Sequence, residues 1–140
     1  MTEASGCAMT DRELLSALES CTLPPSGFGH AAHVRAAYLY LQRFDFATAL
    51  QRMSSILRAY TASLGRPERY HETITVAYMA LIGRAITERG DAGGWPRFVQ
   101  QNPRLLDPDL LLHFYTREEL TLPLGRRTFL LPQARLGAPE

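Results

Sequence analysis

Three of the four histidines of the 140-residue chain lie in two segments of the sequence. His30 and His33 stand three positions apart, and the segment Tyr70-His71-Glu72-Thr73 follows further along the chain. Residues at positions i and i+3 share one helix face, so His30 and His33 can point at one object. Imidazole and carboxylate groups either bind metals or move protons, so these two segments are the candidate functional site.

A divalent-metal site is the first hypothesis for this cluster. Neutral imidazole suits Zn, Cu, Fe and Ni, and three protein ligands with one open position are typical of a catalytic centre. His30, His33 and His71 would be ligands, and Glu72 would be a fourth ligand or a base acting on metal-bound water. The spacing is not that of the His-Glu-x-x-His motif, because no second histidine follows Glu72 on the same helix.

A metal-free site is the alternative hypothesis. The amino ends of helices favour anions and lower the pKa of nearby histidines, which keeps the imidazole neutral and basic. His71 and Glu72, next to Tyr70, would then be the catalytic residues of an enzyme of unknown reaction class. Arg35, Thr73 and Thr75 are the residues expected to contact a small-molecule substrate. A third possibility is that the cluster is structural, or that the protein is an interaction module.

The elements that carry these residues are predicted to be helices. Residues 29–44 have almost no polar face, which is typical of a helix in the middle of a bundle. Residues 46–64 show an apolar stripe, and a second central helix begins between Pro67 and His71 and ends at Gly90. Thr10-Asp11-Arg12-Glu13 and Thr116-Arg117-Glu118-Glu119 are capping boxes that open further helices, and Asp45 is a cap. A short helix is expected at 95–101 and another at 107–115.

The arrangement of these helices brings the candidate residues together. Short connections make neighbouring helices antiparallel, so the sequence predicts an all-α, up-and-down bundle of four main helices with short C-terminal helices across it. The amino ends of the second and fourth helices then lie at the same end of the bundle. His30, His33, His71 and Glu72 are therefore predicted to converge there, facing inward.

Composition limits the other possibilities. The length is that of one domain, residues 1–140, with flexible ends at 1–9 and 133–140. A net charge of +1 indicates neither a nucleic-acid nor a membrane partner. All basic residues are arginine, so no lysine is present to form a Schiff base. The acidic start without a signal-peptide pattern predicts a cytoplasmic protein.

Two motifs resemble those of a widespread bacterial family of small helical proteins. They are the Phe-x-His-x-x-His helix start at Phe28 and the Tyr-His-Glu-Thr-Ile-Thr segment at Tyr70, followed by the stretch from Arg104 to Leu120. The resemblance covers residues 28–132 and implies no activity. It implies that the following residues belong to family motifs: Phe28, His30, His33, Tyr70, His71, Glu72, Thr73 and Thr75.

Overall fold

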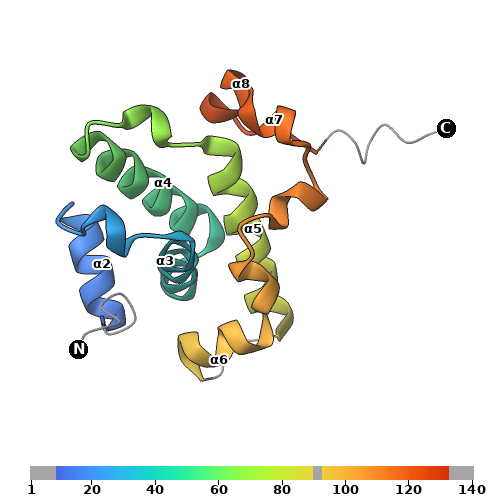
Figure 1. Cartoon of the computed structure of the whole chain (residues 1–140). Coiled ribbons are helices and arrows are strands. Elements are labelled where there is room, and N and C mark those ends of the chain that lie inside the picture. The colour runs from blue at the N-terminus through green and yellow to red at the C-terminus, as the bar shows by residue number, and fades with distance from the viewer. Residues whose placement is uncertain (1–8, 90–92, 133–140) are drawn as a thin grey trace.

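The computed structural model describes residues 9–89 and 93–132, and every regular element in those ranges is a helix (Figure 1). The α-helices are α2 (Asp11–Glu19), α3 (His30–Arg43), α4 (Phe46–Ser63), α5 (Glu72–Arg89), α6 (Gly94–Gln101), α7 (Arg117–Thr121) and α8 (Pro123–Arg127). Single 3₁₀ turns are η1 (Pro25–Gly27), η2 (Pro67–Arg69), η3 (Pro103–Leu106) and η4 (Leu110–His113). The predicted all-helical class is confirmed. Apart from Met9, the ends that were predicted to be flexible lie outside the described residues.

Local capping signals place several helix starts where the sequence predicts them. The hydroxyl of Thr10 accepts from the Glu13 N–H at 3.1 Å, and the Glu13 carboxylate accepts from the Thr10 N–H at 2.9 Å. Thr116 begins α7 through the same reciprocal pair of bonds. The Asp45 carboxylate accepts from the Thr48 N–H at 2.9 Å and begins α4. Each cap satisfies amide groups that a helix start otherwise leaves without partners.

Helix α3 lies at the centre of the main hydrophobic core. It contacts α2, α4 and α5, and all five residues from Ala36 to Tyr40 are buried. Burial on every side agrees with the predicted central position of this helix. Within residues 9–89 and 93–132, no helix combines the length and the apolar character that a membrane crossing requires.

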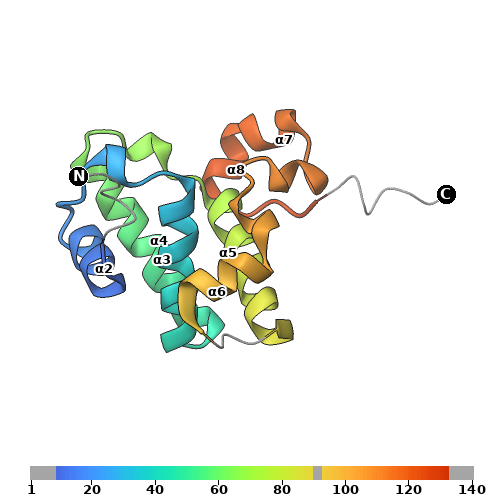
Figure 2. The ribbon, with the colours of Figure 1, turned by 60° about the horizontal axis from the view of Figure 1, so that its bottom comes forward.

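The four-helix up-and-down arrangement is not confirmed. In Figure 1 α3 is seen nearly along its axis, whereas α4 and α5 are seen from the side, and Figure 2 shows α3 lengthwise. The central helices therefore cross rather than lie side by side as in a regular bundle. The amino-terminal halves of α3 and α5 nevertheless face each other, because both line one cavity with α4.

The C-terminal segments pack against α5 through a second, smaller hydrophobic cluster. Its buried members are Ala77 on α5 and Leu111 and Tyr115 from the segment that follows η3. The 3₁₀ turn η4 stands where the sequence predicts a helix over 107–115, and that prediction is wrong. The Asp107 carboxylate accepts from the Asp109 N–H at 2.9 Å, which favours a turn over a helix. The turn also sends Leu110 into the main core and Leu111 into the second cluster.

Candidate functional site

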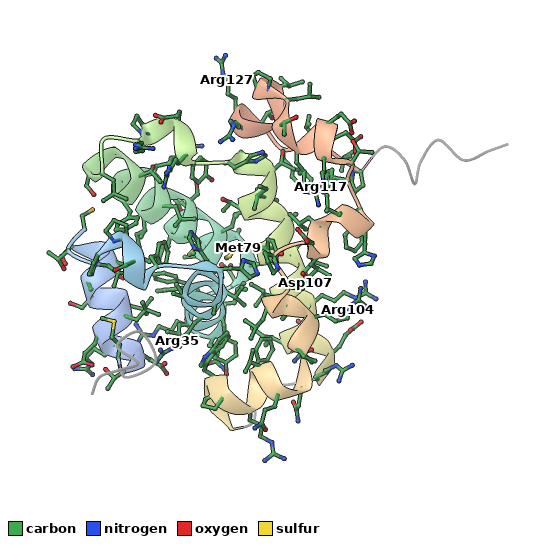
Figure 3. All side chains as sticks on the ribbon, in the orientation of Figure 1. Arg35, Met79, Arg104, Asp107, Arg117 and Arg127 are labelled. Carbon is green, nitrogen blue, oxygen red and sulfur yellow. The ribbon has the colours of Figure 1, made fainter. Side chains whose placement is uncertain are left out.

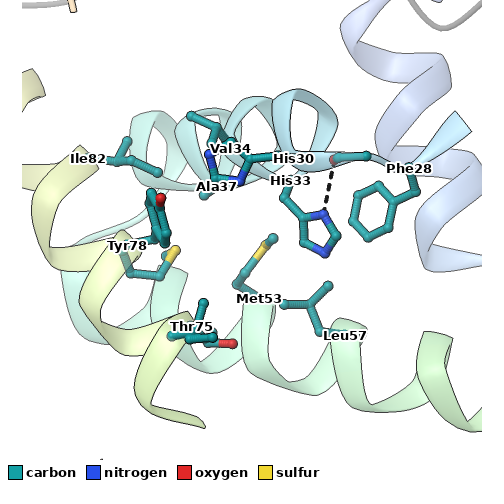
Figure 4. A pocket seen from close by; sticks show the side chains of 13 residues that line it. Phe28, His30, His33, Val34, Ala37, Met53, Leu57, Thr75, Tyr78 and Ile82 are labelled. Atoms are coloured by element: carbon teal, nitrogen blue, oxygen red, sulfur yellow. Dashed lines mark hydrogen bonds between the residues drawn. The ribbon is translucent and has the colours of Figure 1, made fainter. Parts of the chain in front are cut away.

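A cavity of about 330 Å³ lies where α3, α4 and α5 meet (Figure 4). The start of α3, the middle of α4 and the first turns of α5 contribute its walls. The lining residues are Phe28, Gly29, His30, His33, Val34, Ala37, Met53, Leu57, Ile74, Thr75, Tyr78, Met79 and Ile82. Most of these side chains are apolar or aromatic, with a few polar groups among them, which is the usual make-up of a small-molecule pocket.

His33 is a polar group of this cavity with an unused acceptor. Its Nδ1 lies 3.1 Å from the carbonyl oxygen of Gly29, and since a carbonyl only accepts, Nδ1 carries the proton. The ring stacks on Phe28, with centroids 3.8 Å apart and planes inclined by 24°. Within the described residues Nε2 has no hydrogen-bond partner, and Figure 4 shows the ring beside Met53 and Leu57. A neutral His33 thus presents one lone pair to the cavity.

Burial keeps His33 in that neutral form. Desolvation lowers the pKa of His33, the hydrogen bond to Gly29 opposes this, and the charge on neighbouring His30 lowers the pKa further. Neutral imidazole with Nδ1 protonated is a hydrogen-bond acceptor and a weak base at Nε2.

His30 lines the same cavity but is held by its own partner. Its Nε2 lies 3.0 Å from the carbonyl oxygen of Leu105, to which it donates, and its ring meets the ring of Tyr78 edge to face at 5.0 Å. The Tyr78 hydroxyl in turn donates to the carbonyl oxygen of Asp107 at 3.0 Å. His30 and Tyr78 therefore join the cavity wall to the segment that follows α6.

His71 uses both ring nitrogens for backbone contacts. Its Nδ1 accepts from the Ile74 N–H at 3.2 Å, and its Nε2 donates to the carbonyl oxygen of Leu120 at 2.8 Å. The first bond caps α5, and the second attaches α7 to the start of α5. Desolvation lowers the pKa of His71; the bond to Leu120 opposes this, and the charge of Arg126 adds to the lowering. His71 does not line the cavity.

Glu72 and Tyr70 belong to a separate polar network near the surface. The Tyr70 hydroxyl donates to the Glu72 carboxylate at 2.6 Å and lies 2.9 Å from the Ser54 hydroxyl. Arg58 reaches the same carboxylate oxygen at 3.2 Å, and its guanidinium lies 4.3 Å from the centroid of the Tyr70 ring. Burial and the bond to Glu72 raise the pKa of Tyr70, so its hydroxyl remains a donor.

Of the three predicted substrate contacts, only Thr75 lines the cavity. Its hydroxyl donates to the carbonyl oxygen of His71 at 2.8 Å. Thr73 is fully buried and bonds the C-terminal segment instead. Arg35 pairs with Asp11 at 2.7 Å and donates to the carbonyl oxygen of Met9 at 2.8 Å, so it joins α3 to α2.

The structure therefore brings His30, His33 and Thr75 to one cavity and leaves His71, Glu72 and Tyr70 outside its lining. In the described part of the chain, no three histidine, cysteine, aspartate or glutamate side chains are grouped as a metal site requires. Sequence reasoning did not identify the α4 wall, Met53 and Leu57, as part of the site. Both lie on the apolar stripe of that helix, a pattern that also describes ordinary core residues.

Comparison of the chain with protein-family models, with curated proteins and with solved structures gave no match, so the family resemblance of residues 28–132 stays an expectation.

Proposed function

We propose that this protein binds a small, uncharged and largely apolar molecule in the cavity between α3, α4 and α5. The observation that carries the proposal is the lone pair of His33 Nε2 facing an otherwise mainly apolar cavity. Ligand pockets usually combine apolar walls with a few polar groups that orient the ligand. A ligand with one hydroxyl or N–H group would donate to Nε2 and bury its remaining surface.

The volume of the cavity suggests the size of the ligand. A cavity of roughly 150 Å³ holds one benzene molecule, so about 330 Å³ has room for two fused rings. Two methionines, Met53 and Met79, line the walls, and their unbranched side chains adjust to irregular shapes. The aromatic rings of Phe28 and Tyr78 favour a flat ligand.

The ligand is proposed to be uncharged because no aspartate, glutamate or arginine side chain is among the lining residues. An anion would lose its hydration without a cationic partner, and a cation would meet a lowered His33 pKa and no carboxylate. The hydroxyls of Thr75 and Tyr78 already donate to backbone carbonyls, so the imidazole acceptors, His33 Nε2 among them, remain to orient a ligand. We therefore propose binding rather than turnover as the function of the cavity.

These contacts support metal-free ligand binding better than the divalent-metal enzyme that the sequence first favours, although through His33 and not through His71 and Glu72. For His71 to bind a metal it would have to give up the bond to Ile74 that caps α5 or the bond to Leu120. Either loss costs free energy that metal binding would have to offset.

The test compares two ligands of nearly equal shape. 2-Naphthol has a hydroxyl donor, and 2-methoxynaphthalene does not. Calorimetric titration is expected to show saturable binding of both, with 2-naphthol bound about tenfold more tightly because of one buried hydrogen bond. In His33→Phe, which keeps a flat ring on Phe28 but removes the acceptor, the preference for 2-naphthol should disappear.

The control variant is His113→Phe, since His113 lies on η4 away from the cavity lining. It should bind both probes as the unmodified protein does. If neither probe binds saturably, or if the unmodified protein binds both with equal affinity, the proposal is overturned. If His113→Phe loses the preference for 2-naphthol to the same extent as His33→Phe, the assigned role of His33 is overturned.

A further inference from the structure

A second concave surface lies between η2 and α8, away from the cavity. It is a groove of about 520 Å³, lined by Arg58, Pro67, Glu68, Tyr70, Pro123, Arg126 and Arg127. Its two sides, η2 and α8, are far apart in sequence. They are joined by the Arg126 guanidinium, which donates to the carbonyl oxygen of Glu68 at 2.9 Å. This groove shares no lining residue with the cavity that contains His33.

The charge in this groove is not balanced. In the part of the chain that the structure describes, no ion pair joins Arg126 or Arg127 to a carboxylate. The partner of Arg126 is a neutral carbonyl, and Arg127 extends outward from α8 (Figure 3). Arg58 is paired with Glu72, so among the described lining residues the Glu68 side chain is the one carboxylate opposite Arg126 and Arg127. An excess of positive charge remains.

Two of the arginines are already oriented. Arg58 is held by Glu72 and lies over the ring of Tyr70, and Arg126 is held by the Glu68 carbonyl. An arginine fixed by one bond still has N–H donors for a ligand, and it loses less side-chain entropy when the ligand binds. The fork of guanidinium donors matches the oxygens of phosphate and carboxylate groups.

The walls between these arginines are mainly apolar. Pro67 and Pro123 are rigid and have no N–H to offer, and Tyr70 contributes its ring because its hydroxyl is bonded to Glu72. A bare inorganic ion would leave these walls exposed to water. A ligand with an apolar body would cover them.

We infer that the groove between η2 and α8 binds a small organic anion, with a phosphate or carboxylate group at Arg126 and Arg127 and an apolar ring against Pro67, Pro123 and Tyr70. The groove and the cavity are two independent sites, so one can fail a test while the other passes.

The experiment titrates the full chain with phenyl phosphate, benzoate and inorganic phosphate, using amide chemical shifts in two-dimensional NMR. Phenyl phosphate or benzoate should shift residues of η2 and α8, and whichever binds more tightly identifies the oxyanion. The aromatic probe should bind roughly three- to tenfold more tightly than inorganic phosphate because of the apolar walls. Raising the salt from low to physiological concentration should weaken binding.

The test variant is Arg126→Gln combined with Arg127→Gln, which should weaken phenyl phosphate at least about tenfold. The matched control is Arg104→Gln with Arg117→Gln, which removes the same charge outside the groove. The control should change the affinity by less than about twofold, since exposed charges at a distance are screened. The single variant Arg127→Gln keeps the bond between Arg126 and Glu68, and it replaces the double variant if loss of that bond perturbs the fold.

Three results would overturn the inference. One is no saturable shift with any of the three probes. Another is shifts located outside η2 and α8. The third is a control variant that weakens binding as much as the groove variant, which would indicate attraction to net charge alone.

Discussion

The imidazole of His33 lies flat against the ring of Phe28, with the two ring centroids 3.8 Å apart. The same imidazole donates from Nδ1 to the carbonyl oxygen of Gly29, four residues earlier in the chain. Stacking and hydrogen bond together determine the plane of the ring and its tautomer, so Nε2 is left as an acceptor. A sequence of six residues, from Phe28 to His33, thus builds both the ligand-facing atom and its support.

Binding of a hydrogen-bond donor in the cavity should depend on pH through His33. Because burial lowers the pKa of His33 below the ordinary histidine value of about 6.5, the neutral ring predominates at pH 7. The affinity for 2-naphthol should be constant from neutral pH up to the alkaline range in which its own hydroxyl ionises. It should fall when the pH drops through the lowered pKa of His33, where Nε2 becomes a donor. Calorimetric titrations at a series of pH values measure this affinity. A decline that begins above pH 7, or one that persists in His33→Phe, would contradict the assignment.

His71 should behave as a structural residue that caps α5. His71→Ala removes the acceptor for the Ile74 N–H and the donor to Leu120, so the free energy of unfolding should fall by about 1–3 kcal/mol. His71→Asn restores an N-cap acceptor and should recover part of the loss. Urea unfolding followed by circular dichroism gives both values. If asparagine were no better than alanine, the capping role would be wrong.

Thr73 should control the docking of the C-terminal segment on α5. Its hydroxyl lies 2.8 Å from the carbonyl oxygen of Gly125 and 2.9 Å from that of Thr128, and it accepts from the Leu130 N–H at 3.1 Å. Thr73→Val leaves these backbone groups without a buried partner, at a cost of about 1–3 kcal/mol. Hydrogen exchange of the Leu130 amide should become faster in this variant. Thr73→Ser keeps the hydroxyl and should remain near the unmodified protein; similar exchange in both variants would refute this role.

Arg35 should contribute to stability without affecting ligand binding. Its guanidinium is mostly buried and joins α3 to the start of α2 through Asp11 and the Met9 carbonyl. Arg35→Gln should lower the free energy of unfolding by about 1 kcal/mol, since Asp11 is half exposed and the pair is partly screened. The affinity for 2-naphthol should not change. A weaker affinity at unchanged stability would instead favour the predicted substrate contact.

Removal of metal should leave the protein folded and able to bind 2-naphthol. We expect the melting temperature and the affinity to be the same before and after dialysis against a chelator, because the ring nitrogens of His71 are occupied by backbone groups. Elemental analysis of protein purified without a histidine tag checks the starting state. Near-stoichiometric Zn, Fe, Cu or Ni that is lost in His71→Ala would support the divalent-metal prediction and contradict the metal-free binding proposed for the cavity.

The sequence alone determined where several helices begin and which segment is a central helix. Thr10, Asp45 and Thr116 mark helix starts because each side chain bonds an amide three residues later, and such bonds depend on neighbouring residues only. The apolar character of residues 29–44 likewise required a central helix. Loop lengths predicted that the first turns of α3 and α5 approach each other, and both do line the cavity.

Tertiary structure decided which atoms the polar side chains bind. Periodicity tells which side of a helix faces inward, but it does not tell which backbone group lies there. His71 was expected to face His30 and His33, yet the free amide of Ile74 and the carbonyl of Leu120 satisfy both of its nitrogens. Burying such a nitrogen without a partner is costly, so a side chain takes a nearby backbone partner that only the docking of α7 on α5 provides. The tertiary structure places no backbone group at hydrogen-bond distance from Nε2 of His33, so this atom remains as an acceptor at the cavity.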